Sequence, residues 1–240
     1  YRGFVRRLSS TVHYDSSSGS YVDTEIEDPR SLYAIRGFYI WVSYSPEDGL
    51  YKLWVAGIGV VYETEHRIQI IDVGSNAWVV FADLDTGSFY VYDGDNVVLL
   101  SDTWVAGIDV TGGYVVFSKW DGTDYELYIY RKDEGITQFT SNYVNDISPV
   151  AYEGYIIWVS ETGPYATSLE LYMYSFCTRE TRKIYSGRFT MLPRPLWGRQ
   201  VIWVAQEGED SVLYVYDYEL DETTELARYS SGEVLQAFIC

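Results

Sequence analysis

The sequence predicts an all-β fold, a six-bladed β-propeller whose blades are four-stranded antiparallel sheets. Two observations predict this fold. An apolar run with an aromatic residue near its end recurs five times, with the aromatic at Trp41, Phe81, Phe117, Trp158 and Trp203. Each run is followed by a segment in which aliphatic residues and tyrosines alternate, and a period of two is typical of a β-strand.

Each repeat provides four expected strands. The five aromatics are 40, 36, 41 and 45 residues apart, a spacing that suits one four-stranded blade. The first strand is short (148–152 is an example), and the second is the aromatic run, which is apolar on both faces because neighbouring sheets cover it. The third strand alternates (127–130), and the fourth is weaker (136–140).

The repeats set the expected blade boundaries. Five blades are expected at 29–66, 67–102, 103–142, 143–186 and 187–231. The two ends of the chain supply the sixth, because 1–28 contains three strand-like segments and 232–240 contains the missing one. Pairing of the C-terminal strand with the N-terminal strands would remove the open sheet edges that favour aggregation.

Residues Tyr114 to Thr140 resemble the repeat of the TolB-like β-propellers, a WD-like repeat family. They contain an apolar strand, an Asp-Gly turn, an acidic residue, a strand of aliphatic residues and tyrosines, and a closing strand rich in threonine. The resemblance is fair in the blades that end near Ile184 and Leu226, and weak in the first 70 residues. It implies a propeller that serves as an interaction platform or as an accessory domain, and it carries over no catalytic residue.

The charge of the chain is strongly negative, with 35 acidic and 17 basic residues and a formal net charge of -18. Such acidity disfavours nucleic acid as a partner. The longest apolar runs have about five residues, too few for insertion into a membrane.

Basic residues are concentrated in two segments that belong to neighbouring predicted blades. They are Arg2, Arg6 and Arg7 in the first segment, and Arg179, Arg182, Lys183, Arg188, Arg194 and Arg199 in the second. The second segment also contains Glu180, so the two segments carry +3 and +5, and the rest of the chain carries about -26. Two interpretations stay open: local salt bridges to the acidic majority, or a basic patch that binds the acidic surface of another molecule.

Two short loops contain carboxylates that a calcium ion could use. They are the Asp-Gly turns with Asp93 and Asp95, and with Asp121 and Asp124. Because Asp-Gly is also the preferred sequence of a tight hairpin turn, the turn is the stronger interpretation and calcium the weaker one. The two histidines, His13 and His66, fall in different blades and do not predict a zinc site.

The two cysteines, Cys177 and Cys240, do not form a disulfide framework. They are either unpaired thiols or the two ends of a disulfide between subunits. Position 1 is Tyr rather than Met, so two interpretations stay open: an arbitrary boundary of the chain, or a mature protein that has lost a signal peptide.

These features predict a non-catalytic β-propeller of the extracellular space or the cell envelope. Its expected partners are other proteins or copies of itself, in filaments for example, with no cofactor. The alternative is a carbohydrate-active or peptidase-associated propeller with acidic residues around a central channel. The 13 arginines against 4 lysines also hint at a thermophilic source.

Overall fold

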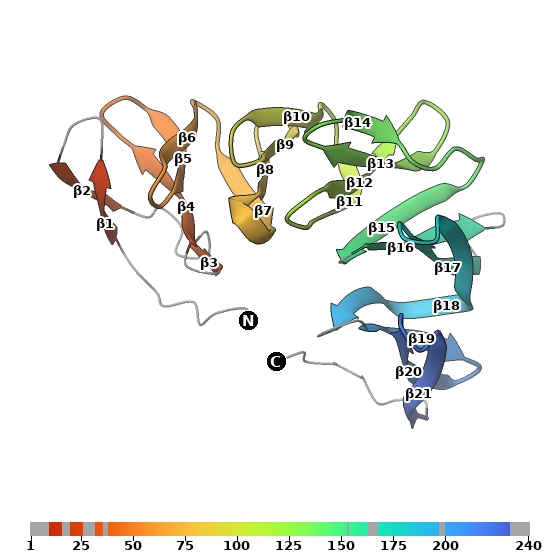
Figure 1. Cartoon of the computed structure of the whole chain (residues 1–240). Helices are drawn as coiled ribbons and strands as arrows, with labels where there is room; N and C mark the ends of the chain where they lie inside the picture. Colours follow the sequence, from red (N-terminus) through yellow and green to blue (C-terminus); the bar gives the residue numbers. More distant parts are fainter. Residues whose placement is uncertain are drawn as a thin grey trace. The chain divides into compact units, whose positions relative to one another are not determined.

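The computed structural model describes residues 10–15, 20–25, 32–35, 38–152, 154–162, 168–196 and 200–230. It confirms an all-β chain of antiparallel sheets, most of them four-stranded. Strands that are neighbours in a sheet are also consecutive in the sequence, so every sheet is a meander (Figure 1). Among the described residues there is no helix long and apolar enough to span a membrane.

Three sheets have four strands each. The first contains β3 (Tyr33–Ile35), β4 (Phe38–Ser45), β5 (Leu50–Val55) and β6 (Gly59–Thr64). The second contains β7 (Ile68–Val73), β8 (Val79–Asp83), β9 (Phe89–Tyr92) and β10 (Val97–Ser101). The third contains β11 (Val105–Val110), β12 (Val115–Trp120), β13 (Tyr125–Arg131) and β14 (Gly135–Gln138).

A seven-stranded sheet follows. Its strands are β15 (Asn145–Tyr152), β16 (Tyr155–Thr162), β17 (Ser168–Ser175), β18 (Glu180–Leu196), β19 (Gln200–Glu207), β20 (Asp210–Asp217) and β21 (Glu222–Tyr229). Near the N-terminus, β1 (Ser10–Asp15) pairs with β2 (Ser20–Glu25) in a two-stranded sheet, with no further partner among the described strands. The expected closing strand at 232–240 lies outside the described residues.

The strand β18 joins two four-stranded sets. Its first half, from Glu180 to Gly187, pairs with β17, and its second half, from Arg188 to Leu196, pairs with β19. Figure 1 shows it as one long light-blue arrow, although the sequence suggested a boundary between residues 186 and 187. Register shifts on either side of Met191 bend the second half, which also accommodates two prolines that cannot donate to a neighbouring strand.

The tyrosines have a structural role: their rings stack between the second and third strands of the repeats. The register places Trp158 directly opposite Tyr172, and Trp203 directly opposite Tyr214. The same contact occurs in all five repeats, with ring centroids 5.4 to 5.7 Å apart: Trp41–Trp54, Phe81–Tyr90, Phe117–Tyr128, Trp158–Tyr172 and Trp203–Tyr214. Stacked cross-strand pairs add to the stability of a sheet, so much of the aromatic content is architectural.

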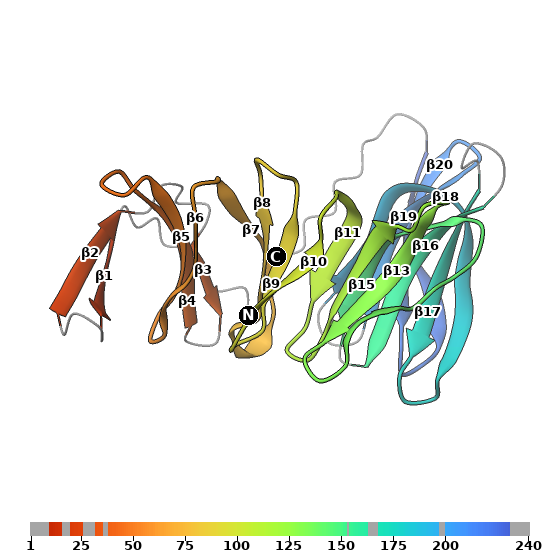
Figure 2. The same cartoon turned by 90° about the horizontal axis from the view of Figure 1, so that it is seen from above.

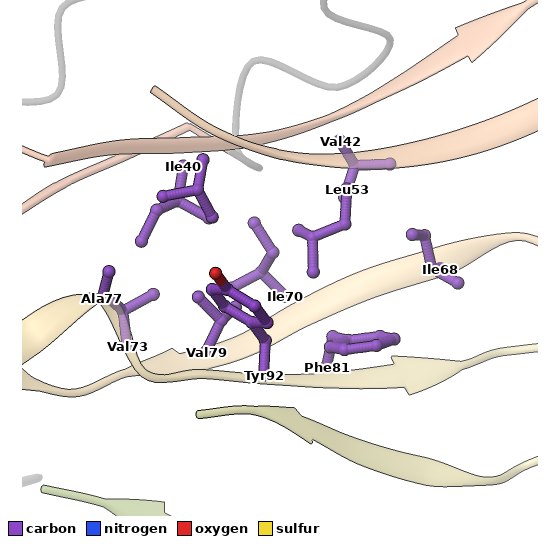
Figure 3. Close-up of a cluster of buried hydrophobic side chains, with 11 residues drawn as sticks. Ile40, Val42, Leu53, Ile68, Ile70, Val73, Ala77, Val79, Phe81 and Tyr92 are labelled. Carbon is purple, nitrogen blue, oxygen red and sulfur yellow. The ribbon is translucent and has the colours of Figure 1, made fainter. Parts of the chain in front are cut away.

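The chain divides into two compact units, and each has its own core. The first unit contains Tyr1–Val105, Val110–Val115 and Tyr130–Ile136, and the second contains the remaining residues. In the first unit the sheets β3–β6 and β7–β10 lie side by side (Figure 2). Their facing side chains, among them Ile40, Leu53 and Phe81, are fully buried (Figure 3).

The core of the second unit lies between β16–β17 and β19–β20. Val159 and Leu171 from one strand pair meet Val201 and Trp203 from the other, and all four are completely buried. These residues occupy alternate positions of their strands, as the period of two predicted. Within each unit, the packing of one sheet against the next excludes water from these side chains.

Candidate functional site

The first Asp-Gly turn, between β9 and β10, uses its carboxylates within the protein. Asp93 Oδ1 accepts the backbone N–H groups of Asp95 and Asn96 at 3.0 and 2.9 Å. Asp93 Oδ2 accepts the hydroxyl of Tyr130 at 2.6 Å, and Asp95 forms an ion pair with Lys132. Because both side chains already have donors, this turn has the features of a structural hairpin turn.

The second Asp-Gly turn, between β12 and β13, is different. Asp121 Oδ1 accepts the N–H groups of Thr123 and Asp124 at 2.8 and 3.3 Å, which stabilises the turn. The side chain of Asp124 points inward, since only 6% of the residue is exposed, and neither of its carboxylate oxygens has a hydrogen-bond partner among the described residues. Burial of a carboxylate without a donor is costly, so this arrangement calls for a counter-charge or a proton.

Glu126 lies next to Asp124 because residues two apart on an extended chain share a face. It is completely buried. Its Oε1 accepts the N–H of Asn142, while its Oε2 has no hydrogen-bond partner within the described ranges. One carboxylate oxygen from each of Asp121, Asp124 and Glu126 lies within 4.8 Å of the other two. These three residues are called the acidic cluster below.

The β14–β15 loop and the first residues of β15 pack against the start of β13, where Glu126 of the acidic cluster lies. Asn142 bonds to Glu126 through its backbone, and Asn145 Oδ1 accepts the N–H of Tyr125 at 3.0 Å. Asp146, which is 1% exposed, accepts hydrogen bonds from the indole of Trp158 at 3.1 Å, from the hydroxyl of Ser160 and from the side-chain amide of Asn142 at 2.8 Å. Asp146 is therefore a buried carboxylate whose donors are in place.

The electrostatics of the cluster follow from this burial. Burial raises the pKa of Asp124, and the nearby carboxylates of Asp121 and Asp146 raise it further. Burial also raises the pKa of Glu126, with a contribution from Asp146 and Asp124, although Thr140 and Asn142 donate hydrogen bonds that oppose the shift. The cluster is thus a place where a cation or a proton is favoured.

Exposed aromatic side chains flank the same turn and loop. Trp120, immediately before Asp121, is 48% exposed and packs edge-on against Tyr125 at a centroid distance of 5.5 Å. Tyr143, next to Asn142, is 92% exposed. The acidic cluster therefore adjoins a surface with two large aromatic side chains.

The structure locates only part of the predicted basic segments. Arg179, Arg182, Lys183 and Arg188 are exposed around the β17–β18 turn and along β18. Arg182 forms an ion pair with Asp221, and Lys183 forms one with Glu170 at 2.9 Å. For these two residues the structure agrees with the first interpretation, local salt bridges. The side chain of Arg194 and all of Arg199, Arg2, Arg6 and Arg7 lie outside the described residues.

Of the two cysteines, Cys177 is exposed and unpaired in the β17–β18 turn, and Cys240 lies outside the described residues. A disulfide between subunits would need both thiols at a protein surface, and Cys177 meets this condition.

His66 is hydrogen-bonded to a carboxylate, that of Asp83. Its Nδ1 lies 2.7 Å from Asp83 Oδ2, while Asp83 Oδ1 accepts the N–H groups of Asp85 and Thr86. The bond to Asp83 raises the pKa of His66 above 6.5. Burial by itself would raise the pKa of the Asp83 carboxyl. The hydrogen bonds that this carboxyl accepts from the Thr86 N–H, the His66 ring and the Asp85 N–H outweigh burial and lower its pKa below 3.8.

The pH dependence of this pair has a defined sign. Stabilisation by a protonated His66 is fully present below pH 6.5, the ordinary pKa of the ring, and is lost as pH rises through the raised pKa. The contribution of ionised Asp83 is lost only when pH falls through its lowered pKa. An NMR titration of the His66 ring is expected to give a pKa above 6.5, and Asp83→Asn should return it toward 6.5 while keeping the turn acceptor. An unchanged His66 pKa in that variant would contradict the assignment.

Two residues of the site were not singled out from the sequence, Glu126 and Asp146. For Glu126 a signal exists, since Asp124 and Glu126 alternate with period two at the start of a strand, which places two acids on one face. For Asp146 the signal is weak, because its donors Trp158 and Ser160 are 12 and 14 residues away on the next strand.

No family model matches the chain, and no curated protein matches it in sequence. A solved prolyl endopeptidase structure is similar with a TM-score of 0.59 and 12% identity, over 91% of this chain and 38% of that one. An oligogalacturonate lyase in complex with manganese is similar with a TM-score of 0.50 and 11% identity, over 93% of this chain and 85% of that one.

These neighbours are propellers. The likeness therefore supports a propeller-type repeat fold. TolB from Acinetobacter baumannii also matches, with 12% identity over 92% of this chain and 76% of that one, but its TM-score of 0.46 is too low to support an argument. The chain spans well under half the length of the prolyl endopeptidase, and at these identities the likeness concerns the fold alone.

Proposed function

We propose that this chain is a non-catalytic six-bladed β-propeller of the extracellular space or the cell envelope, and that it binds other proteins, including copies of itself. In this proposal residues 1–28 and 232–240 together form the sixth blade. The observation that carries the function is the exposure of Trp120, at the end of β12, and of Tyr143, in the β14–β15 loop. This loop is held to the neighbouring strand β13 by the hydrogen bond from the Asn142 N–H to Glu126. Large aromatic side chains provide rigid contact area at a low entropic cost, and they are enriched in protein interfaces.

The charge distribution supports contacts between copies. Arg179 and Arg188 are exposed, and within the described part of the chain neither has an ion-pair partner. Most of the remaining charge is negative. A surface with unpaired arginines on an otherwise acidic protein is complementary to the acidic surface of a second copy.

Light scattering from micromolar to millimolar concentration tests the proposal. We expect a molar mass that increases with concentration and decreases with added salt, because exposed ion pairs are screened. The double variant Trp120→Ala with Tyr143→Ala should weaken the association. Leu226→Ala, which also truncates an exposed apolar side chain, is the matched control and should leave it unchanged.

A monomer at every concentration and salt condition, with the Cys177 thiol fully reactive, would count against self-association. Association that the aromatic double variant leaves intact would show that another surface is responsible.

The acidic cluster also bears on the enzymatic alternative, a carbohydrate-active or peptidase-associated propeller. Acids that converge beside an aromatic side chain are the arrangement that such a site would need. However, Glu126 is completely buried and Asp124 is 6% exposed, so neither carboxyl group can contact a polymeric substrate as the chain is folded. This burial is the reason for proposing the non-catalytic role first.

A further inference from the structure

The acidic cluster contains more negative charge than its surroundings compensate. Asp121, Asp124 and Glu126 bring three carboxylates together, and the carboxylate of Asp146 is close enough to raise the pKa of both buried members. Three oxygens, both of Asp124 and Oε2 of Glu126, are buried without a hydrogen-bond partner in the part of the chain that the structure describes. A folded protein rarely leaves such groups unsatisfied, so the cluster points to a ligand that supplies positive charge.

The donor set selects the class of ligand. All the available atoms are carboxylate oxygens, which favour hard cations such as calcium and magnesium over zinc or copper. For three atoms that lie within 4.8 Å of one another, there is always a point that is about 2.8 Å or less from each of them. An ion at that point is therefore at a distance close to the 2.3–2.6 Å of calcium–oxygen bonds. Magnesium requires about 2.0–2.1 Å and a strict octahedron, which a turn with separations of this size fits less well.

The position of the cluster also suits an exchangeable ion. Asp121 is exposed, so one side of the cluster is open to water that would complete the coordination shell. Asp124 and Glu126 form the buried side. The ligands come from six consecutive residues, and the hydrogen bonds of Asp121 already fix the turn that presents them.

We propose that Asp121, Asp124 and Glu126 bind a calcium ion. The bound ion neutralises the buried carboxylates and, through the bond between Glu126 and Asn142, stabilises the contact of the start of β13 with the β14–β15 loop. The corresponding acids of the first Asp-Gly turn do not share this role, because Asp93 and Asp95 already have protein donors. This inference does not depend on the proposed function.

Terbium, a luminescent substitute for calcium, gives a direct test on the full-length chain. Trp120 and Tyr125 adjoin the cluster, so excitation of these rings should sensitise terbium emission, and added calcium should quench it by displacement. Calcium should also raise Tm by about 3–6 °C at about ten times its Kd, and magnesium should act more weakly. The absence of both the emission and the Tm increase at millimolar ion concentration would overturn the proposal.

Conservative variants locate the site. Asp124→Asn and Glu126→Gln keep the side-chain shape and remove one charge each, and each is expected to weaken calcium binding by at least about tenfold. In EDTA their Tm should equal or exceed that of the parent, because an uncompensated buried charge has been removed. This second measurement shows that the variants fold.

Asp95→Asn is the matched control, since it removes a charge from the other Asp-Gly turn, where Asp95 already pairs with Lys132. It should bind terbium and calcium as the parent does. Calcium binding that is lost in Asp95→Asn and retained in Asp124→Asn would also overturn the assignment.

Discussion

Trp203→Ala is expected to lower the free energy of unfolding by about 3–5 kcal/mol, because it removes a completely buried aromatic side chain and leaves a cavity. Trp203 lies in the core of the second unit, where it stacks on Tyr214 at 5.6 Å and contacts Tyr185 at 5.5 Å. Chemical denaturation followed by circular dichroism measures the change.

Trp203→Phe is the control for this prediction. The indole nitrogen of Trp203 is buried and has no hydrogen-bond partner among the residues that the structure describes. Replacing the indole by a phenyl ring therefore keeps most of the stacking and removes an unsatisfied donor. We expect a much smaller loss than for alanine. Equal losses in the two variants would mean that ring stacking does not support this sheet.

Asp146→Ala is expected to cost about 3 kcal/mol or more, measured in EDTA so that ion binding does not contribute. The carboxylate accepts bonds from Trp158, Ser160 and Asn142, and removing it leaves the buried indole and hydroxyl donors without an acceptor. The loss should appear as a decrease in the denaturant midpoint at an unchanged m-value.

Asp133→Ala is the reference for the general effect of removing one negative charge. Asp133 is exposed, so its replacement should change stability by no more than about 0.5 kcal/mol. If Asp146→Ala were as mild as this, the hydrogen-bond network around Asp146 would not be a structural element.

Much of the fold could be predicted from the sequence because its signal is local and repeated. The aromatic at Trp158 and the tyrosine at Tyr172 lie on consecutive strands joined by a hairpin, so the period of two and the spacing already imply that they pair. The continuity of β18 was not predictable in this way, because a strand that changes partners halfway has the same local pattern as two strands.

The candidate site shows where the sequence stops being sufficient. The two Asp-Gly turns look alike, and by itself the sequence determined that both are hairpin turns rich in acid. Only the tertiary structure decided that they differ: Asp93 meets the hydroxyl of Tyr130, 37 residues further along, whereas Asp124 is buried beside Glu126 with no donor. The physical reason is that turn geometry depends on neighbouring residues, while the solvation and charge balance of a carboxylate depend on whatever the fold packs against it.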